Sequence, residues 1–278
     1  QRQMCIRDRA ALAEVAWTQP WHKNWRSFLV AMDKFNEHLS AKGIVFACSM
    51  YNIQHTVTPV NGKLQVKLEC ERPDVEIRYT MDGKEPTDRS LLYKSPLMVT
   101  GTQTIKCTTY RAGRQMGKTL TLPLVWNKAT AKPVLGNTQA GKILVNGIRG
   151  SLRQSDFEWH SWESSDSVAF TIDLQKKESL RSVSVGCITN YGMAAHKPAD
   201  IEVWVSNDNR DYRKVSGKQF TDGEIFREGT FKEDVVLDLN KKIGRYVRII
   251  AKGAGECPAT HVRPGQEARI YFDEVMIE

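Results

Sequence analysis

Apolar side chains follow two different periods along this chain of 278 residues. Between Asn24 and Leu39 they recur at every third or fourth position, which predicts an amphipathic helix that begins at an Asn24 cap. Residues 10–17 predict a shorter helix, which ends before Pro20. From about His55 onward, short runs rich in alternating apolar and polar residues lie between Gly, Pro and Asp turns, which indicates β-strands. The pattern therefore predicts a mainly β protein with a short helical segment in front.

The β part divides at a polar segment that contains Gly and Pro. Before it, the runs KLQVKLEC, VEIRYTMDG, PLMVTG and QTIKCTTYRAG predict a small antiparallel sandwich of about 75 residues. After it, the runs AFTIDL, LRSVSVGCI, DIEVWVSND, EDVVLDL, RYVRIIAKG and RIYFDEVMIE predict a second, larger sandwich. The expected boundaries are a helical region at 10–52, a first sandwich at 53–128, a linker at 129–136 and a second sandwich at 137–278. Residues 1–9, QRQMCIRDR, resemble an adapter-derived leader and have no apolar core of a secretory signal.

Charge, apolar runs and cysteine spacing narrow the functional classes. The formal net charge is +8, but Lys and Arg are interspersed with Asp and Glu, so no basic stripe for nucleic acid is present. The longest apolar runs are far shorter than the roughly 20 residues of a membrane helix, so no membrane span is expected. The six cysteines show no CxxC spacing, and Cys70 and Cys107 are either a disulfide pair or buried free thiols.

The segment AALAEVAWTQPWHKNWRSFL resembles the last barrel helix and C-terminal tail of glycoside hydrolase family 20, the β-N-acetylhexosaminidases. The resemblance implies a catalytic barrel upstream in the same chain and a periplasmic or extracellular location. Family members carry their catalytic Asp-Glu pair in an H-x-G-G-D-E motif, which this sequence lacks. Its one Asp-Glu dipeptide, Asp273-Glu274, lies on a predicted strand whose successive side chains should point to opposite faces. We therefore expect no catalytic residue, no catalytic cofactor and no hydrolase activity in these 278 residues.

Two further stretches resemble families of β-sandwich modules. VEIRYTMDGKEPTDRSLLYKSPLMV is similar to the chitobiase/β-hexosaminidase C-terminal domain, which is an immunoglobulin-like spacer. LVNGIRGS, FTIDLQ, IEVWVSNDNRDYRKV, GRYVRIIAKG and FDEVMIE resemble, in that order, the discoidin or coagulation factor V/VIII C-type domain. This second resemblance covers residues 137–278 and implies a jelly-roll sandwich with ligand loops at one end. Bacterial members of that family are commonly carbohydrate-binding modules of family 32.

The discoidin resemblance also implies a structural Ca²⁺ site. In that family the turn that corresponds to VNG usually carries an Asp, which ligates the ion together with backbone carbonyls and a Glu on the last strand. Asn146 stands at the Asp position and Glu274 at the Glu position, and Ser151 is a third candidate ligand. An amide oxygen is still a hard ligand, but the lost formal charge weakens the expected affinity.

Sugar recognition needs an aromatic plane for the apolar face of a pyranose and directional polar groups for its hydroxyls. Such side chains gather on three predicted loops, which we expect at one end of the second sandwich. The candidates are Glu158, Trp159, His160 and Trp162 on the first loop, Tyr191 and His196 on the second, and His261, Arg263 and Gln266 on the third. For Trp159 and Trp162 the pattern does not decide whether the rings face a ligand or form a small core that pins the loop.

Two functions follow from these resemblances. In the first, the discoidin-like region binds galactose- or N-acetylhexosamine-containing glycans and raises the local substrate concentration for the tethered barrel. In the second, the same region is a structural or protein-docking module that packs on the barrel.

Overall fold

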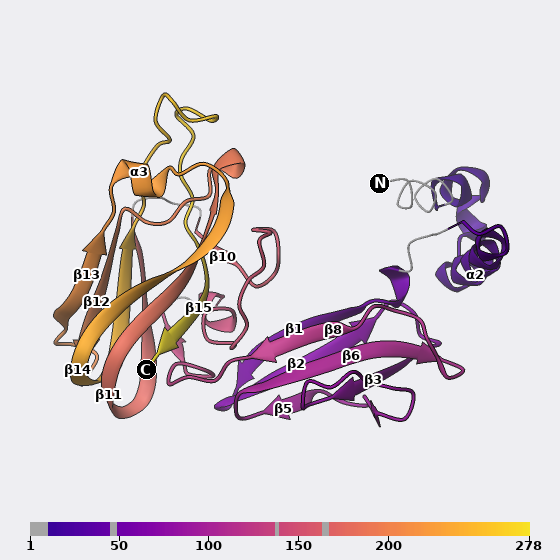
Figure 1. Ribbon diagram of the computed structural model, residues 1–278, viewed down its shortest axis with the longest axis horizontal. Coiled ribbons are helices and arrows are strands. Elements are labelled where there is room, and N and C mark those ends of the chain that lie inside the picture. The colour runs from indigo at the N-terminus through magenta and orange to yellow at the C-terminus, as the bar shows by residue number, and fades with distance from the viewer. Residues whose placement is uncertain (1–10, 45–48, 137–138, 163–166) are drawn as a thin grey trace. The chain divides into compact units, whose positions relative to one another are not determined.

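The computed structural model of the protein describes residues 11–44, 49–136, 139–162 and 167–278. The chain divides into two units. The first consists of residues 1–54, 68–94 and 106–121, and the second of residues 55–67, 95–105 and 122–278. Strands make up most of the secondary structure, and the strand pairs are antiparallel (Figure 1). The predicted mainly β fold is confirmed, whereas the leader at 1–9 lies outside the described residues.

A short helical segment precedes the strands. Residues 11–17 form a helix, Pro20–His22 form one 3-10 turn (η1), and Trp25–Ala41 form the longer helix α2. Asn24 caps α2 as predicted, because its Oδ1 accepts the Ser27 N–H at 3.1 Å. Within the ranges described above, no helix is both long and apolar enough to cross a membrane.

The inner face of α2 packs within the first unit. Leu29 and Met32 are buried against Met50 and Tyr51, which lie in the 3-10 turn Ser49–Tyr51 (η2). This burial gives the helix the apolar partner that its periodic stripe requires.

Asp33 on the same helix belongs to an ion network. Its carboxylate accepts hydrogen bonds from the Tyr51 hydroxyl at 2.7 Å, from Arg72 at 2.7 Å and from Arg111 at 2.9 Å. Both arginines also contact Asp74. The hydrogen bond from Arg72 lowers the pKa of Asp74 to about 2, so this carboxylate stays ionised into strongly acidic solution. Directional contacts therefore hold α2 in addition to apolar burial.

Two sheets form the β part before residue 125. The first has the strand order β1-β2-β5, and the second has the order β4-β3-β6-β7 with β8 also paired to β6. The strands are β1 Ile53–Val60, β2 Lys63–Cys70, β3 Glu76–Thr80, β4 Leu91–Leu92, β5 Leu97–Val99, β6 Gln103–Arg111, β7 Arg114–Gln115 and β8 Leu120–Leu124. The turn between β1 and β2 consists of Asn61 and Gly62, both with positive φ, as a two-residue hairpin of type I′ requires.

The larger β part is a seven-stranded sheet in the order β10-β15-β11-β14-β12-β13, with β9 paired to β11. The strands are β9 Val134–Leu135, β10 His160–Ser161, β11 Val168–Asn190, β12 Asp200–Ser206, β13 Arg213–Gln219, β14 Thr230–Lys252 and β15 Tyr271–Ile277.

The two longest strands, β11 and β14, form one antiparallel ribbon that bends over near its middle (Figure 1). Register shifts interrupt their pairing there, and such irregularities let a strand pair bend. One end of the ribbon pairs with β12 and the other with β15, so the ribbon supplies strands to two layers. Side chains from both layers, such as Phe170, Val185 and Ile249, form one buried core.

The linker predicted at 129–136 is wrong. Ala129 is fully buried in the core of the larger sheet, and Val134 and Leu135 form β9 against β11. The segment looked like a linker because its small and polar residues show no apolar period. Small side chains such as Ala129 and Ala131 nevertheless fit a tightly packed core.

The structure decides whether Cys70 and Cys107 form a disulfide or remain free thiols. Those within the described residues, Cys70, Cys107, Cys187 and Cys257, are free thiols. Burial raises the pKa of Cys107 to about 12, so this thiol is protonated and unreactive at neutral pH. Cys70 and Cys107 are therefore separate thiols and not a disulfide.

Candidate functional site

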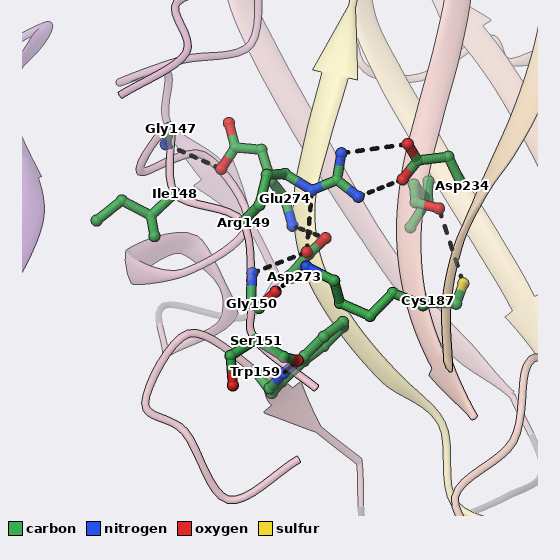
Figure 2. Close-up of polar contacts among 12 residues, drawn as sticks. Gly147, Ile148, Arg149, Gly150, Ser151, Trp159, Cys187, Asp234, Asp273 and Glu274 are labelled. Atoms are coloured by element: carbon green, nitrogen blue, oxygen red, sulfur yellow. Dashed lines mark hydrogen bonds and ion pairs between the residues drawn. The ribbon is translucent and has the colours of Figure 1, made fainter. Parts of the chain in front are cut away.

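A β-bulge in β15 brings two neighbouring carboxyl groups into one buried cluster (Figure 2). Asp273 and Glu274 together oppose Gly186 of β11, and both side chains are fully buried against the turn at 146–151. The expectation that their side chains point to opposite faces is therefore wrong, because it assumed the alternation of an unbroken strand. Gly186 is needed opposite the bulge, since a Cβ there would lie 1.8 Å from Asp273 Oδ1.

Asp273 holds the turn by backbone hydrogen bonds and an ion pair. Its Oδ2 accepts the Gly150 N–H and the Arg149 Nε–H, both at 2.9 Å, and its Oδ1 accepts the Glu274 N–H at 2.5 Å. Arg149 also contacts Asp234 on β14, and Figure 2 shows the guanidinium between the two aspartates. No local sequence pattern identifies Arg149 as a site residue, because its carboxylate partners lie 124 and 85 residues away in the chain.

Glu274 has the properties of a cation ligand. One carboxylate oxygen accepts the Gly147 N–H at 2.9 Å, and the other lies 3.4 Å from Asn127 Nδ2. Burial raises the pKa of its carboxyl group well above the ordinary value, more than the Gly147 hydrogen bond lowers it. A cation beside Glu274 would keep this carboxylate ionised, since no ion pair with it occurs within the described residues.

The other two expected Ca²⁺ ligands differ from each other. Asn146 is buried in the same turn, where its Oδ1 accepts the Ile148 N–H at 2.9 Å. Ser151 is exposed, and its hydroxyl contacts Asp156. Asn146 and Glu274 carry oxygen atoms of the kind that a hard cation prefers, and both contact the turn at 146–148, whereas the Ser151 hydroxyl contacts Asp156.

The first predicted sugar loop is held by two of its own candidates. Trp159 is 6% exposed, and its Nε1–H donates to the Ser151 carbonyl at 3.0 Å. Its ring lies against Gly150, where an added Cβ would come within 2.3 Å of the indole. Glu158 accepts a hydrogen bond from His55 Nε2 at 2.8 Å. Both side chains anchor the loop.

His160 and Trp162 belong to the sheet and its core. His160 lies in β10, which pairs with the start of β15. The Trp162 ring stacks nearly parallel to Phe170, with centroids 6.1 Å apart and planes 13° apart, and meets Phe272 edge-on. Burial lowers the pKa of His160, whose ring contacts Trp162 with centroids 4.5 Å apart. For both tryptophans the structure favours anchoring over ligand contact.

The exposed aromatic ring of this loop is Phe157, which the sequence analysis did not select. Its side chain is 92% exposed, and the nearby Leu152 is 56% exposed. Phenylalanine is ordinarily assigned to a core. The sequence feature that indicates an exposed Phe157 is its position between two charged residues, Asp156 and Glu158, which rarely flank a buried ring.

The second and third loops meet in a ring cluster, defined here as Tyr191, His196, Phe226 and His261. Tyr191 opens the 3-10 turn Tyr191–Met193 (η4), and its ring centroid lies 3.9 Å from that of His261. The His196 centroid lies 5.0 Å from that of Phe226. His196 and His261 are only 1% and 4% exposed, so these two candidates lie beneath the surface.

The two imidazoles are joined through their Nε2 atoms, which lie 3.2 Å apart. His196 Nδ1–H donates to the Ile225 carbonyl at 3.0 Å, whereas His261 Nδ1 accepts the Arg263 N–H at 3.0 Å. Burial lowers the pKa of His196 to about 4, and it also lowers the pKa of His261. Both rings are therefore neutral at pH 7.

Arg263 lies over this base. Its Nε–H donates to the Gly192 carbonyl at 2.6 Å, and its Nη1 donates to Gln266 Oε1 at 3.2 Å. Its Nη2 lies 3.5 Å from Met193 Sδ. A guanidinium carries five N–H donors, so these three contacts hold the group in place and leave two donors for a ligand.

The three predicted sugar loops lie near one another at the start of β15, but within the described residues only the second and third loops contact each other through side chains. Backbone hydrogen bonds join Trp162 N–H to the Ile270 carbonyl and His196 N–H to the Arg269 carbonyl, just before β15 begins. The second and third loops also meet through side chains. The first loop directs Trp162 toward the core and Trp159 toward the turn at 146–151, and it leaves Phe157 exposed.

Two family comparisons account for most of the β part. Residues 58–121 match the chitobiase/beta-hexosaminidase C-terminal domain, and residues 128–263 match the F5/8 type C domain. The chain carries one domain of each family. The two module resemblances are thus confirmed, and the F5/8 type C match begins at residue 128, immediately before the predicted linker. The similarity of residues 10–52 to family 20 hydrolases stays a prediction, and a search of curated proteins found no match to the chain.

Several solved structures are similar to part of the chain. CpGH89CBM32-5 from Clostridium perfringens, in complex with GalNAc-β-1,3-galactose, is 14% identical and covers 43% of this chain and 73% of its own, with a TM-score of 0.31. A fucose binding module of Streptococcus pneumoniae is 18% identical and covers 55% of this chain and 94% of its own, with a TM-score of 0.33. The C-terminal domain of a chitobiase from Bacteroides fragilis is 10% identical and covers 47% and 76%, with a TM-score of 0.29.

Proposed function

We propose that the F5/8 type C domain binds galactose- or N-acetylhexosamine-containing glycans at a surface formed by Tyr191, Arg263 and Gln266. The observation that carries this proposal is the Arg263 guanidinium, which is fixed by three contacts and keeps two donors for sugar hydroxyls. The half-buried Tyr191 ring beside it supplies an aromatic contact for the apolar face of a pyranose. The buried His261 beneath contacts the Tyr191 ring and accepts the backbone N–H of Arg263.

The test is a glycan array followed by calorimetric titration of the full chain with the best galactose- or N-acetylgalactosamine-containing glycan. Arg263→Ala should weaken binding by about 10- to 100-fold, because hydrogen bonds to a charged group contribute about 1.5–3 kcal/mol. The matched control is Arg210→Ala, since Arg210 is an exposed arginine of the turn after β12. Binding by Arg263→Ala at the affinity of the unchanged chain would refute this location.

A second variant tests whether glycans bind at the first loop instead of the Arg263 surface. Phe157→Ala removes the exposed ring of the first loop and should leave binding unchanged. If Phe157→Ala abolishes binding and Arg263→Ala does not, the domain still binds glycans but does so at the first loop. If the unchanged chain binds no galactose-, N-acetylhexosamine- or fucose-containing glycan, the function is wrong.

We also propose that Glu274 and Asn146 bind a structural Ca²⁺. Arg149 already balances Asp273, whereas the buried Glu274 accepts hydrogen bonds from two neutral donors, the Asn127 amide and the Gly147 N–H. Calcium at 100 times its Kd should stabilise the fold by about 2.7 kcal/mol, and Glu274→Gln should abolish the calcium-dependent rise in Tm. The control variant is Glu256→Gln, at an exposed glutamate of the third loop. A Tm that is the same in calcium and in chelator would contradict the proposal.

We further propose that residues 10–52 belong to a family 20 barrel located upstream in the same chain, which supplies the hydrolysis in a periplasmic or extracellular enzyme. Apart from the resemblance, support comes from Trp17, Trp21 and Trp25, which are 88%, 75% and 58% exposed. Exposed apolar side chains gathered in one segment are typical of an interaction surface. Upstream coding sequence without an H-x-G-G-D-E motif would contradict the proposal.

A further inference from the structure

We propose that His196, Cys257 and His261 form a binding site for a borderline divalent transition metal, with zinc(II) as the best match. The three residues come from the second and third loops and are buried. The site lies beneath the proposed sugar surface, and its three ligands are not among the residues proposed to contact the glycan.

The geometry is close to that of a tetrahedral centre. One ring nitrogen of each histidine and the Cys257 Sγ all lie within 4.8 Å of one another. Bond lengths of about 2.0–2.1 Å for Zn–N put two nitrogen ligands about 3.3 Å apart, and those in His196 and His261 are 3.2 Å apart. With a Zn–S bond of about 2.3 Å the sulfur belongs about 3.6 Å from each nitrogen, so Cys257 has to approach by about 1 Å at most.

The donor set selects the metal. Imidazole suits zinc, copper, iron and nickel, whereas thiolate favours zinc and copper(I), so one thiolate with two imidazoles points to zinc as the divalent ion. Three protein ligands leave a fourth position for water or a small anion. Hard cations such as calcium require oxygen ligands, which distinguishes this site from the one proposed at Glu274.

The surroundings of His196 are those of a metal ligand. Its Nδ1–H donates to the Ile225 carbonyl at 3.0 Å, which leaves the Nε2 lone pair directed at His261. Metal-bound histidines commonly donate their other N–H to a backbone carbonyl in this way, which fixes both tautomer and ring orientation.

Metal binding has a defined structural consequence at His261. In the metal-free protein its Nδ1 accepts the Arg263 N–H, so its Nε2–H faces the lone pair of His196. Coordination through Nε2 moves this proton to Nδ1 and removes the acceptor of the Arg263 amide. The Cys257 thiol releases a proton as its sulfur binds the metal. The turn at 261–263 therefore rearranges when the metal is bound.

The experiment is a titration of the full chain, reduced and treated with chelator, with cobalt(II) as a spectroscopic substitute for zinc. We expect one cobalt per chain, a thiolate-to-cobalt charge-transfer band, visible bands of a tetrahedral ion, and loss of all bands when one equivalent of zinc is added. Cys257→Ser should abolish the charge-transfer band. His196→Gln and His261→Gln should each weaken cobalt binding by at least about tenfold.

Matched controls are Cys70→Ser and His38→Gln, which remove a partly exposed thiol and an exposed histidine outside the site and should bind cobalt like the unchanged chain. Absence of the charge-transfer band in the unchanged chain would overturn the proposal, and so would its persistence in Cys257→Ser. The 3.2 Å contact between the histidines would then be an N–H···N hydrogen bond only. No sugar is present in this assay, so its failure leaves the glycan proposal unaffected.

A second measurement uses only the unchanged chain, so its outcome does not depend on whether a substituted protein folds. The unchanged chain is labelled with a thiol reagent in mild denaturant, with and without zinc, and the labelled cysteines are mapped by mass spectrometry. Selective protection of Cys257 by zinc is expected. Protection of Cys70, Cys5 or Cys48 without protection of Cys257 would overturn the proposal, because zinc would then bind elsewhere.

Discussion

Asp273→Ala is expected to destabilise the F5/8 type C domain by about 3–5 kcal/mol, which is the cost of removing one partner of a buried charged pair. The Asp273 side chain is fully buried, and its loss leaves the Gly150 and Glu274 amides without their acceptor. Arg149 loses its Nε partner at the same time. The free energy of unfolding, measured by urea denaturation of the full chain, tests the value, and Tm should fall with it.

The matched control is Asp234→Ala, which removes the other partner of the same arginine. The Asp234 side chain is 39% exposed, and water can replace it as a partner of Arg149. The expected loss is below about 1 kcal/mol, as for other exposed ion pairs. Equal losses for the two variants would show that the bulged carboxylate is no more important to the fold than a surface ion pair.

Trp162→Ala is expected to cost about 3–5 kcal/mol of unfolding free energy, the usual range for deleting a large aromatic side chain from a core. Its ring packs on Phe170 and Phe272, two of the largest fully buried side chains of the chain. Phe157→Ala in the same loop removes a ring that is 92% exposed and should change stability by less than about 0.5 kcal/mol. Urea denaturation of both variants gives the comparison.

A Trp162→Ala variant that keeps its stability would contradict this expectation. If Trp162→Ala keeps the stability of the unchanged chain and loses glycan binding, its ring faces the ligand and not the core. Glycan titration of the same preparations distinguishes the two roles, because a core substitution in a protein that remains folded leaves binding affinity nearly unchanged.

The elements that the sequence predicted well are those with a local physical cause. The apolar stripe and the Asn24 cap predict α2, since both depend on residues within a few positions of one another. The strands follow from the period of two between turn residues. The β-module motifs identified both domain families for the same reason, because they are continuous in the chain.

The candidate site was predicted less completely, because its contacts join distant parts of the chain. The first loop supplied aromatic residues of the expected kind, but Trp159 is buried, Trp162 is partly buried against the core and Phe157 is exposed. No local pattern separates these cases, since each ring follows the space left by other strands. The histidines of the second and third loops were selected as sugar contacts, yet tertiary packing places both beneath the surface.

The fold class, the two domain families and the residue types of the loops follow from the amino-acid sequence, because each depends on local periodicity or on continuous motifs. How those loop residues are used depends on tertiary packing. A one-residue register shift in β15 turned Asp273 and Glu274 toward one turn, and chain folding joined His196 to His261 across 65 residues. Register shifts and long-range packing depend on how all strands of the sheet fit together. A short stretch of sequence contains only some of the residues that determine this fit.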